Sequence, residues 1–110
     1  MLTHPEIDAR SRALHRLVAD KVRLEPARFE RARTILRHWR IVVCENSQPY
    51  LAEWEGLFRQ GVEPTLAVAV EDSERADALR QCSPLAGVLT NRERWAFLRD
   101  WSRSHEAQGA

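Results

Sequence analysis

Apolar residues recur every three or four positions in the second quarter of the chain, and this spacing constrains the fold more than any other feature. The series is Phe29, Ala32, Leu36, Trp39 and Val43. Such steps place one apolar stripe on one face of a helix. Pro26 suits a first helical turn, where its missing N–H is no loss. We therefore predict a helix from Pro26 to about Glu45, which the polar cluster 46–49 ends.

The preceding segment has the same periodicity and predicts a first long helix near residues 5–23. Its apolar stripe contains Ile7, Leu14, Leu17, Val18 and Val22. Two long helices with a short connection pack antiparallel, so we expect a long N-terminal helical hairpin.

Shorter helices are predicted after the hairpin. A third apolar stripe contains Tyr50, Leu51, Trp54, Leu57 and Phe58. Ser47 offers a cap at its start, and Gly61 offers a stop at its end. Residues 64–70 are ambiguous, because apolar residues alternate there as in a strand. We favour a helix, since a lone strand would leave its backbone groups unpaired.

Two capping signals mark the last third of the chain. Asp72 or Ser73 caps a short helix through about Gln81. Thr90 and Glu93 stand at capping-box spacing before a final helix. The apolar face of that helix contains Trp95, Leu98 and Trp101.

The segment between these two helices, residues 83–89, predicts an irregular loop. Pro84 forces an extended residue before it, and Gly87 permits a turn at positive φ. The apolar residues Leu85, Val88 and Leu89 then fill gaps in the core.

These elements predict an all-α protein, a compact bundle of five or six helices. The long N-terminal hairpin carries shorter C-terminal helices packed across it. A length of 110 residues favours one domain spanning 1–110, with a tail that frays from about residue 105.

The lengths of the apolar runs and the charges in the N-terminal segment predict where in the cell the protein resides. No apolar run approaches the roughly 18 to 20 residues that a membrane helix needs. Charged residues interrupt the N-terminal segment, unlike a secretory signal. Cys44 and Cys82 are too few for a disulfide scaffold. We expect a cytoplasmic protein that has no membrane segment.

The net charge of +1 conceals an asymmetry between the two parts of the chain. Residues 1–45 hold ten Lys or Arg against six acids, and residues 46–110 hold seven against ten. The two parts either attract each other within one fold or form patches that face a partner. Four tryptophans are many for this length, so we also expect one or two at the surface as interface anchors.

Three arginines, Arg33, Arg37 and Arg40, stand along one edge of the second predicted helix. Such a stripe is typical of phosphate binding, which makes a small DNA-binding regulator the alternative function. The pI of about 7.9 favours a solvated helix face instead.

No catalytic or metal-binding constellation is recognisable in the sequence. The four glycines stand singly, there is no Gly-x-Ser-x-Gly elbow, and no Cys and His share a zinc-ligand spacing. Cys44, flanked by apolar residues, is typical of a small core residue. We predict a non-enzymatic protein without a metal or cofactor.

A run of short motifs between residues 71 and 95 resembles a family of small bacterial helical proteins. The run reads EDSER, then LRQ, SPLAGVL and ERW. Leu85 stands where that family has Phe, a conservative difference. The first half is similar through Ala13-Leu14-His15, Pro49-Tyr50 and Glu53-Trp54-Glu55, so the resemblance covers nearly the whole chain.

Members of that family tend to be encoded beside a nucleotidyltransferase-like protein, in an arrangement that looks like a toxin–antitoxin module. The resemblance implies an antitoxin-like neutraliser that binds such a toxin. The partner-binding residues that we predict are Glu71, Asp72, Arg75, Arg80, Leu85, Arg94 and Trp95.

Structural bracing is the other interpretation of the same segment. Arg80 and Arg94 either bind loop carbonyls or pair with Glu71 and Asp72, which would hold the short helices together. A helical hairpin with an exposed Trp also leaves a homodimer open.

Overall fold

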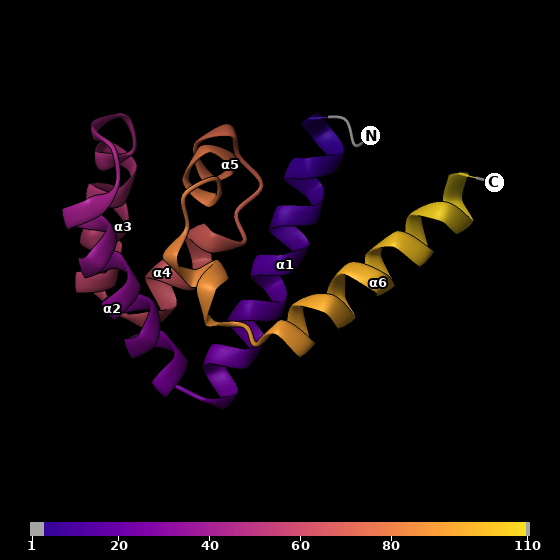
Figure 1. Cartoon of the computed structure of the whole chain (residues 1–110), viewed down its shortest axis with the longest axis horizontal. Helices are drawn as coiled ribbons and strands as arrows, with labels where there is room; N and C mark the ends of the chain where they lie inside the picture. The colour runs from indigo at the N-terminus through magenta and orange to yellow at the C-terminus, as the bar shows by residue number, and fades with distance from the viewer. Residues whose placement is uncertain (1–3, 110) are drawn as a thin grey trace.

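The computed structural model describes residues 4–109, with side chains described through Ser104, and this part of the chain is all-helical (Figure 1). It confirms the predicted all-α bundle. The elements are α1 His4–Leu24, α2 Ala27–Val42, the 3-10 helix η1 Glu45–Ser47, α3 Gln48–Gln60, α4 Val62–Ala69, α5 Glu74–Arg80, the 3-10 helix η2 Pro84–Val88 and α6 Asn91–Gly109.

The two long N-terminal helices form the predicted hairpin, which opens as a V in Figure 1. The 3-10 helix η2 lies between its arms and packs against both α1 and α2. Leu85 and Val88 of η2 are buried in the same core as Phe29 and Leu36 of α2. On the other side, α3 packs against α2, and the short helices α4 and α5 pack against α1 and α3.

The connection between α2 and α3 differs from the prediction. Helix α2 ends at Val42, because Val43 is extended, with φ −82° and ψ 149°. The hydroxyl of Ser47 makes no capping hydrogen bond. The side chain of Gln48 instead caps the C-terminal end of α2, since its amide donates to the carbonyls of Trp39 and Val43 at 3.2 and 3.0 Å.

A stop at Gly61 and a cap at Ser73, both predicted from the sequence, are confirmed. Gly61 ends α3 and precedes α4 with a φ of 119°, which favours glycine. The ambiguous segment 64–70 is helical through Ala69. Ser73 caps α5 by accepting a hydrogen bond from the N–H of Ala76 at 3.1 Å.

The segment predicted as an irregular loop is the 3-10 helix η2. Ser83 caps it by accepting a hydrogen bond from the N–H of Leu85 at 3.2 Å. The predicted positive φ at Gly87 is wrong, since Gly61 is the residue with positive φ in the described range. Gly87 instead lies against Ile35, whose Cδ1 would be 2.9 Å from an added Cβ.

The last helix diverges from the bundle. Figure 1 shows α6 leaving the base of α1 and pointing away from the other helices. It continues to Gly109, past the point near 105 where the sequence predicts fraying. None of the helices within 4–109 combines the length and apolar character that crossing a bilayer demands.

Candidate protein-binding surface

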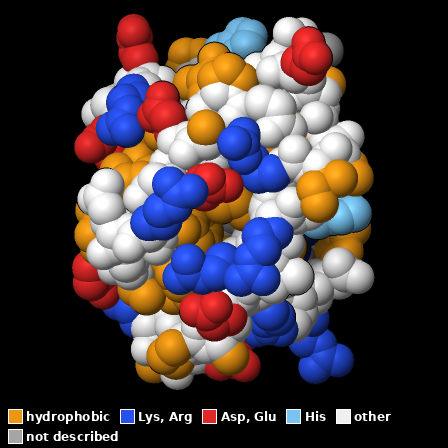
Figure 2. Space-filling view, turned by 90° about the vertical axis from the view of Figure 1, so that its left-hand side faces the viewer, with side chains coloured by type: hydrophobic (Ala, Val, Ile, Leu, Met, Phe, Trp, Pro, Cys, Tyr) orange, Lys and Arg blue, Asp and Glu red, His pale blue; other side chains and the backbone are white. Residues whose placement is uncertain are grey.

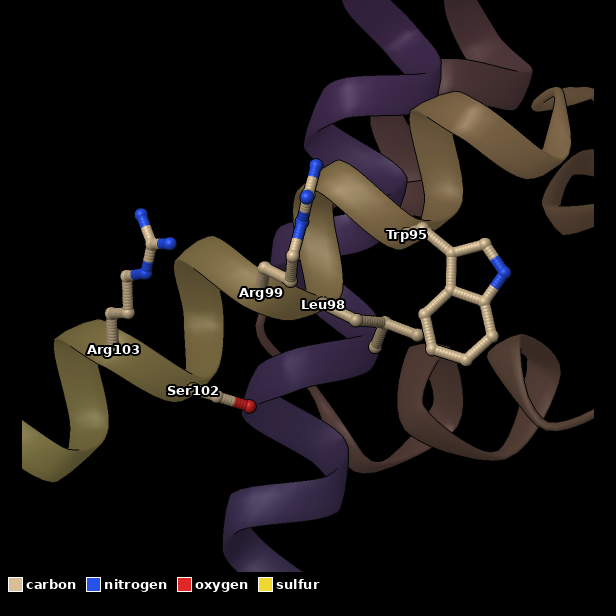
Figure 3. A pocket seen from close by; sticks show the side chains of 5 residues that line it. All are labelled: Trp95, Leu98, Arg99, Ser102 and Arg103. Atoms are coloured by element: carbon tan, nitrogen blue, oxygen red, sulfur yellow. The ribbon is translucent and has the colours of Figure 1, made fainter.

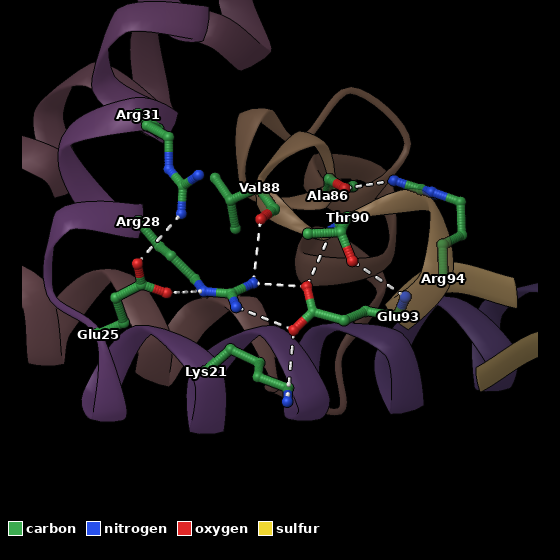
Figure 4. A network of polar contacts seen from close by, with 9 residues as sticks. All are labelled: Lys21, Glu25, Arg28, Arg31, Ala86, Val88, Thr90, Glu93 and Arg94. Carbon is green, nitrogen blue, oxygen red and sulfur yellow. Dashed lines mark hydrogen bonds and ion pairs between the residues drawn. The ribbon is translucent and has the colours of Figure 1, made fainter. Parts of the chain in front are cut away.

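A network of charged side chains anchors the start of α6 to the hairpin (Figure 4). Arg28, buried at the start of α2, donates to both carboxylate oxygens of Glu93 at 2.7 and 2.9 Å. The same guanidinium bonds to Glu25 at 2.8 Å and to the carbonyl of Val88 at 3.2 Å. Lys21 of α1 completes the network, with its Nζ 3.3 Å from Glu93. Three elements therefore meet at one carboxylate.

Glu93 is also a member of the predicted capping box, which is confirmed. Its carboxylate accepts from the N–H of Thr90 at 2.8 Å, and its own N–H donates to the Thr90 hydroxyl at 3.1 Å. The bonds from Arg28 and Thr90 hold the pKa of Glu93 well below its usual range. The next residue, Arg94, donates to the carbonyl of Ala86 in η2. The first turn of α6 is thus fixed in direction.

Beyond this base, α6 exposes apolar side chains. Trp95 is 65% exposed, although its indole is the largest apolar side chain that a protein can bury. Figure 3 shows Trp95 and Leu98 on one side of α6, at a shallow hollow. The hollow is also lined by Arg99, Ser102 and Arg103. The prediction that at least one Trp lies at the surface is confirmed.

A second hollow lies between α6 and the first half of α1. It is lined by Ile7, Arg10, Ser11, Leu14, Arg94, Phe97 and Leu98. Leu98 belongs to both hollows, so they form one continuous surface. We call the residues of the two hollows together the α1–α6 surface. Its members are apolar, hydroxyl-bearing or arginine side chains, and none is a carboxylate.

The opposite side of the angle between α1 and α6 has a different chemistry. The hollow there is lined by Leu17, Lys21, Arg92, Glu93, Ala96, Phe97 and Asp100. It contains two carboxylates, and Lys21 already pairs with Glu93. Phe97 occurs in the hollows on both sides, so its ring lies in the angle between the two helices.

The predicted partner-binding residues are dispersed in the structure. Of the seven, Arg94 and Trp95 belong to the α1–α6 surface. Asp72 pairs with Arg12 of α1 at 2.6 Å, and Arg75 pairs with Glu53 of α3 at 3.0 Å. The carboxylate of Glu71 is exposed and accepts from the hydroxyl of Ser73 at 2.6 Å.

The remaining two predicted residues are interior. Leu85 is 0% exposed and belongs to the core. Arg80 is buried and donates to the carbonyls of Ala69 and Glu71 at 3.0 and 2.8 Å, while it also pairs with Asp77. Both side chains brace the fold, and neither is accessible to a partner in this conformation.

The arginine stripe of α2 is largely engaged in contacts within the chain. Figure 2 shows this side of the molecule, where Lys and Arg side chains surround a hollow. The guanidinium of Arg33 lies over the rings of Phe29 and Phe58. Arg40 pairs with Glu55 at 3.4 Å and bonds to Gln48. Arg37 lines the hollow and is exposed.

Sequence reasoning missed several members of the α1–α6 surface. Arg99 and Arg103 recur four positions apart beside the predicted apolar face of the last helix, a signal that was readable. Arg10 and Ile7 carried no such signal, because only the fold brings the start of α1 beside α6. The role of Arg28 could not be predicted from the sequence either, since its partner Glu93 lies 65 positions away.

The chemistry of this surface suits binding. Among the described side chains, no group of three or more His, Cys, Asp or Glu is placed to hold a metal ion. Apolar side chains beside arginine forks instead offer area to bury and donors for carboxylates. Comparisons with known proteins find no matching family model, no similar curated protein and no similar solved structure.

Proposed function

We propose that this chain is a non-enzymatic, antitoxin-like binding protein that neutralises a nucleotidyltransferase-like partner by steric contact. The resemblance of residues 71–95 supplies the class of partner. The observation that carries the proposal is the α1–α6 surface, where Trp95 is 65% exposed among apolar and arginine residues.

This surface has the composition of a binding site. Trp and Arg are the residues that most often dominate the free energy of binding in protein interfaces. An apolar centre beside charged groups also matches the usual arrangement of an interface core and rim. Such a surface neutralises by covering the partner, so the inhibition follows the stoichiometry of binding and needs no turnover.

The test is co-expression with the protein encoded beside this chain, followed by size-exclusion chromatography with light scattering. We expect a defined heteromeric complex and restored growth relative to the neighbour alone. Trp95→Ala should remove the largest exposed apolar contact and weaken the complex by tenfold or more, about 1.4 kcal/mol or above.

A matched control is Ile41→Ala, which removes an apolar side chain that is 82% exposed on α2, away from α6. We expect this variant to bind and to restore growth like the wild type. If the neighbour elutes alone and its toxicity is unchanged, the proposal fails. DNA binding is then the next test, with Arg37→Ala and a salt titration as its readouts.

A further inference from the structure

We propose that the α1–α6 surface receives an acidic amphipathic helix, a segment of the partner whose apolar stripe is flanked by Asp or Glu. This inference rests on the proposed function and specifies which part of the partner is bound. The observation behind it is that the lining of this surface combines apolar side chains with arginines and contains no carboxylate.

The arginines determine the sign of the charge that the surface accepts. Four of them, Arg10, Arg94, Arg99 and Arg103, line the two hollows. Arg94 has a carbonyl partner in η2, whereas Arg99 and Arg103 lie exposed on α6. A lysine-rich segment would meet like charges here, while carboxylates would form hydrogen-bonded ion pairs.

The shape of the surface favours a helix over an extended segment. Helices α1 and α6 meet at the Glu93 network and diverge from it (Figure 1). Apolar side chains of both helices, Ile7 and Leu14 on one and Leu98 on the other, line the angle between them. A third helix can lay an apolar face along both, which is the usual helix-in-groove mode. The described residues offer no strand edge to which an extended peptide could add.

The same features disfavour two other occupants. A second copy related by a twofold axis would place this basic surface against itself, and neither lining contains a carboxylate to pair with the arginines of the other. A nucleic acid would satisfy the arginines, but single strands bind by stacking successive bases on aromatic rings. Ile7, Leu14 and Leu98 are aliphatic, and the ring of Phe97 is partly buried and stacked on Trp101. Trp95 is the one large aromatic side chain in the described range that is mostly exposed.

The experiment uses the full chain and two synthetic fluorescein-labelled helical peptides. Both carry the same Leu and Ala stripe, flanked by Glu in one peptide and by Lys in the other. Fluorescence anisotropy should show saturable binding of the Glu peptide, with the Lys peptide at least about tenfold weaker. The double variant R99A/R103A should weaken binding of the Glu peptide by about tenfold, and added salt should do the same.

The matched control is R37A/R59A, which removes two arginines from the hollow between α2 and α3. We expect it to bind the Glu peptide like the wild type. Equal binding of the two peptides, no binding of either, or an equal loss in the control overturns the inference. So does a dimer that Trp95→Ala dissociates, or an oligonucleotide that displaces the Glu peptide and binds more tightly.

The complex with the neighbouring protein separates this inference from the proposed function. If that complex forms and R99E/R103E leaves its affinity unchanged, the acidic-helix inference fails and the proposed function stands. If no complex forms, the proposed function fails, while the peptide titration still decides the charge preference of the surface.

Discussion

At the scale of single residues, His15 makes the most consequential contact that the sequence does not reveal. The imidazole is 1% exposed in the interior of α1. Its Nδ1–H donates to the carbonyl of Ser11 at 2.7 Å, and because a carbonyl only accepts, this bond fixes the tautomer. Nε2 therefore accepts from the hydroxyl of Ser83 at 2.8 Å, and that hydroxyl in turn accepts from the N–H of Leu85. The neutral ring ties α1 to the start of η2.

This network predicts that the protein loses stability in mild acid. Burial, together with the nearby charges of Arg80 and Arg94, lowers the pKa of His15 from 6.5 to about 4. At pH values between these two pKa values, His15 is therefore protonated in the unfolded chain but neutral in the folded chain. The free energy of unfolding consequently falls as the pH drops through that window. We expect a loss of about 2 kcal/mol from about pH 7 to about pH 5 in urea unfolding.

The control for this prediction is His38→Gln, because His38 is exposed on α2. It should keep the full pH dependence, whereas His15→Gln should lower stability at neutral pH and flatten the slope. The stability that Glu93 contributes is lost as the pH falls through its ordinary pKa of 4.5 and below, so Glu93 has little effect between about pH 7 and about pH 5. A wild-type stability that is constant between about pH 7 and about pH 5 would contradict the account.

The two cysteines should differ in reactivity. Cys44 is exposed, contrary to the expectation of a core residue, because α2 ends before it. Hydrogen bonds from the Ser47 hydroxyl and backbone N–H lower its pKa, whereas burial raises the pKa of Cys82. We expect a disulfide reagent to modify Cys44 first and Cys82 in a slower phase. Cys44→Ser should abolish the fast phase alone; a single phase for both thiols would refute the prediction.

At the scale of elements, the carboxylate of Glu93 holds α6 on the hairpin. Glu93→Gln keeps the capping bond to Thr90 but removes the charge opposite the buried Arg28. We expect the free energy of unfolding to fall by about 2 kcal/mol, and by about 3 kcal/mol in Glu93→Ala, which also loses the cap. Chemical denaturation measures both values.

The matched control is Glu63→Gln. Glu63 also forms a two-bond pair with an arginine, Arg23, but this pair is exposed. Solvent screens such a pair, so the substitution should leave stability nearly unchanged. Equal losses in the Glu63 and Glu93 variants would mean that the network at the base of α6 has no special role.

The elements also show how far the sequence predicts this fold. The presence of the helices could be predicted from apolar spacing and from local capping pairs such as Thr90–Glu93, because both signals lie within a few residues. The boundary between α2 and α3 could not be predicted in this way. It depends on hydrogen bonds from the Gln48 side chain to two carbonyls, and a glutamine in the sequence does not indicate such bonds. The conformation of η2 also depends on partners far along the chain, including His15.

The candidate site was predictable to a smaller extent. Helical spacing placed Trp95 on the apolar face of the last helix, but only the structure shows that this side chain is exposed. Leu85 and Arg80 belong to the motif that was predicted to bind a partner, yet both side chains are buried. Motif spacing within a sequence does not distinguish these cases. The contribution of α1 depends on the direction in which α6 leaves the bundle.

At the scale of the whole molecule, the chain has two levels of packing. Helices α1 to α5 and η2 share one core, and α6 extends from it (Figure 1). The radius of gyration of 14.2 Å exceeds the value of about 13 Å that is expected for a compact chain of this length. The projecting helix accounts for the difference and exposes the apolar residues that a partner would cover.

This arrangement predicts two tiers of amide hydrogen exchange. Amides of α3, whose Leu51 and Trp54 are fully buried, should exchange only through global unfolding. Amides of α6 beyond Leu98 should exchange much faster, because a helix of this length that lacks tertiary packing is marginal in water. Mass spectrometry of peptic fragments measures both.

A bound partner helix should slow exchange in α6 and the first half of α1 and leave α3 unchanged. Protection of α6 equal to that of α3 in the free monomer would contradict the two-tier account, and protection that disappears on dilution would show that a second copy covers this helix.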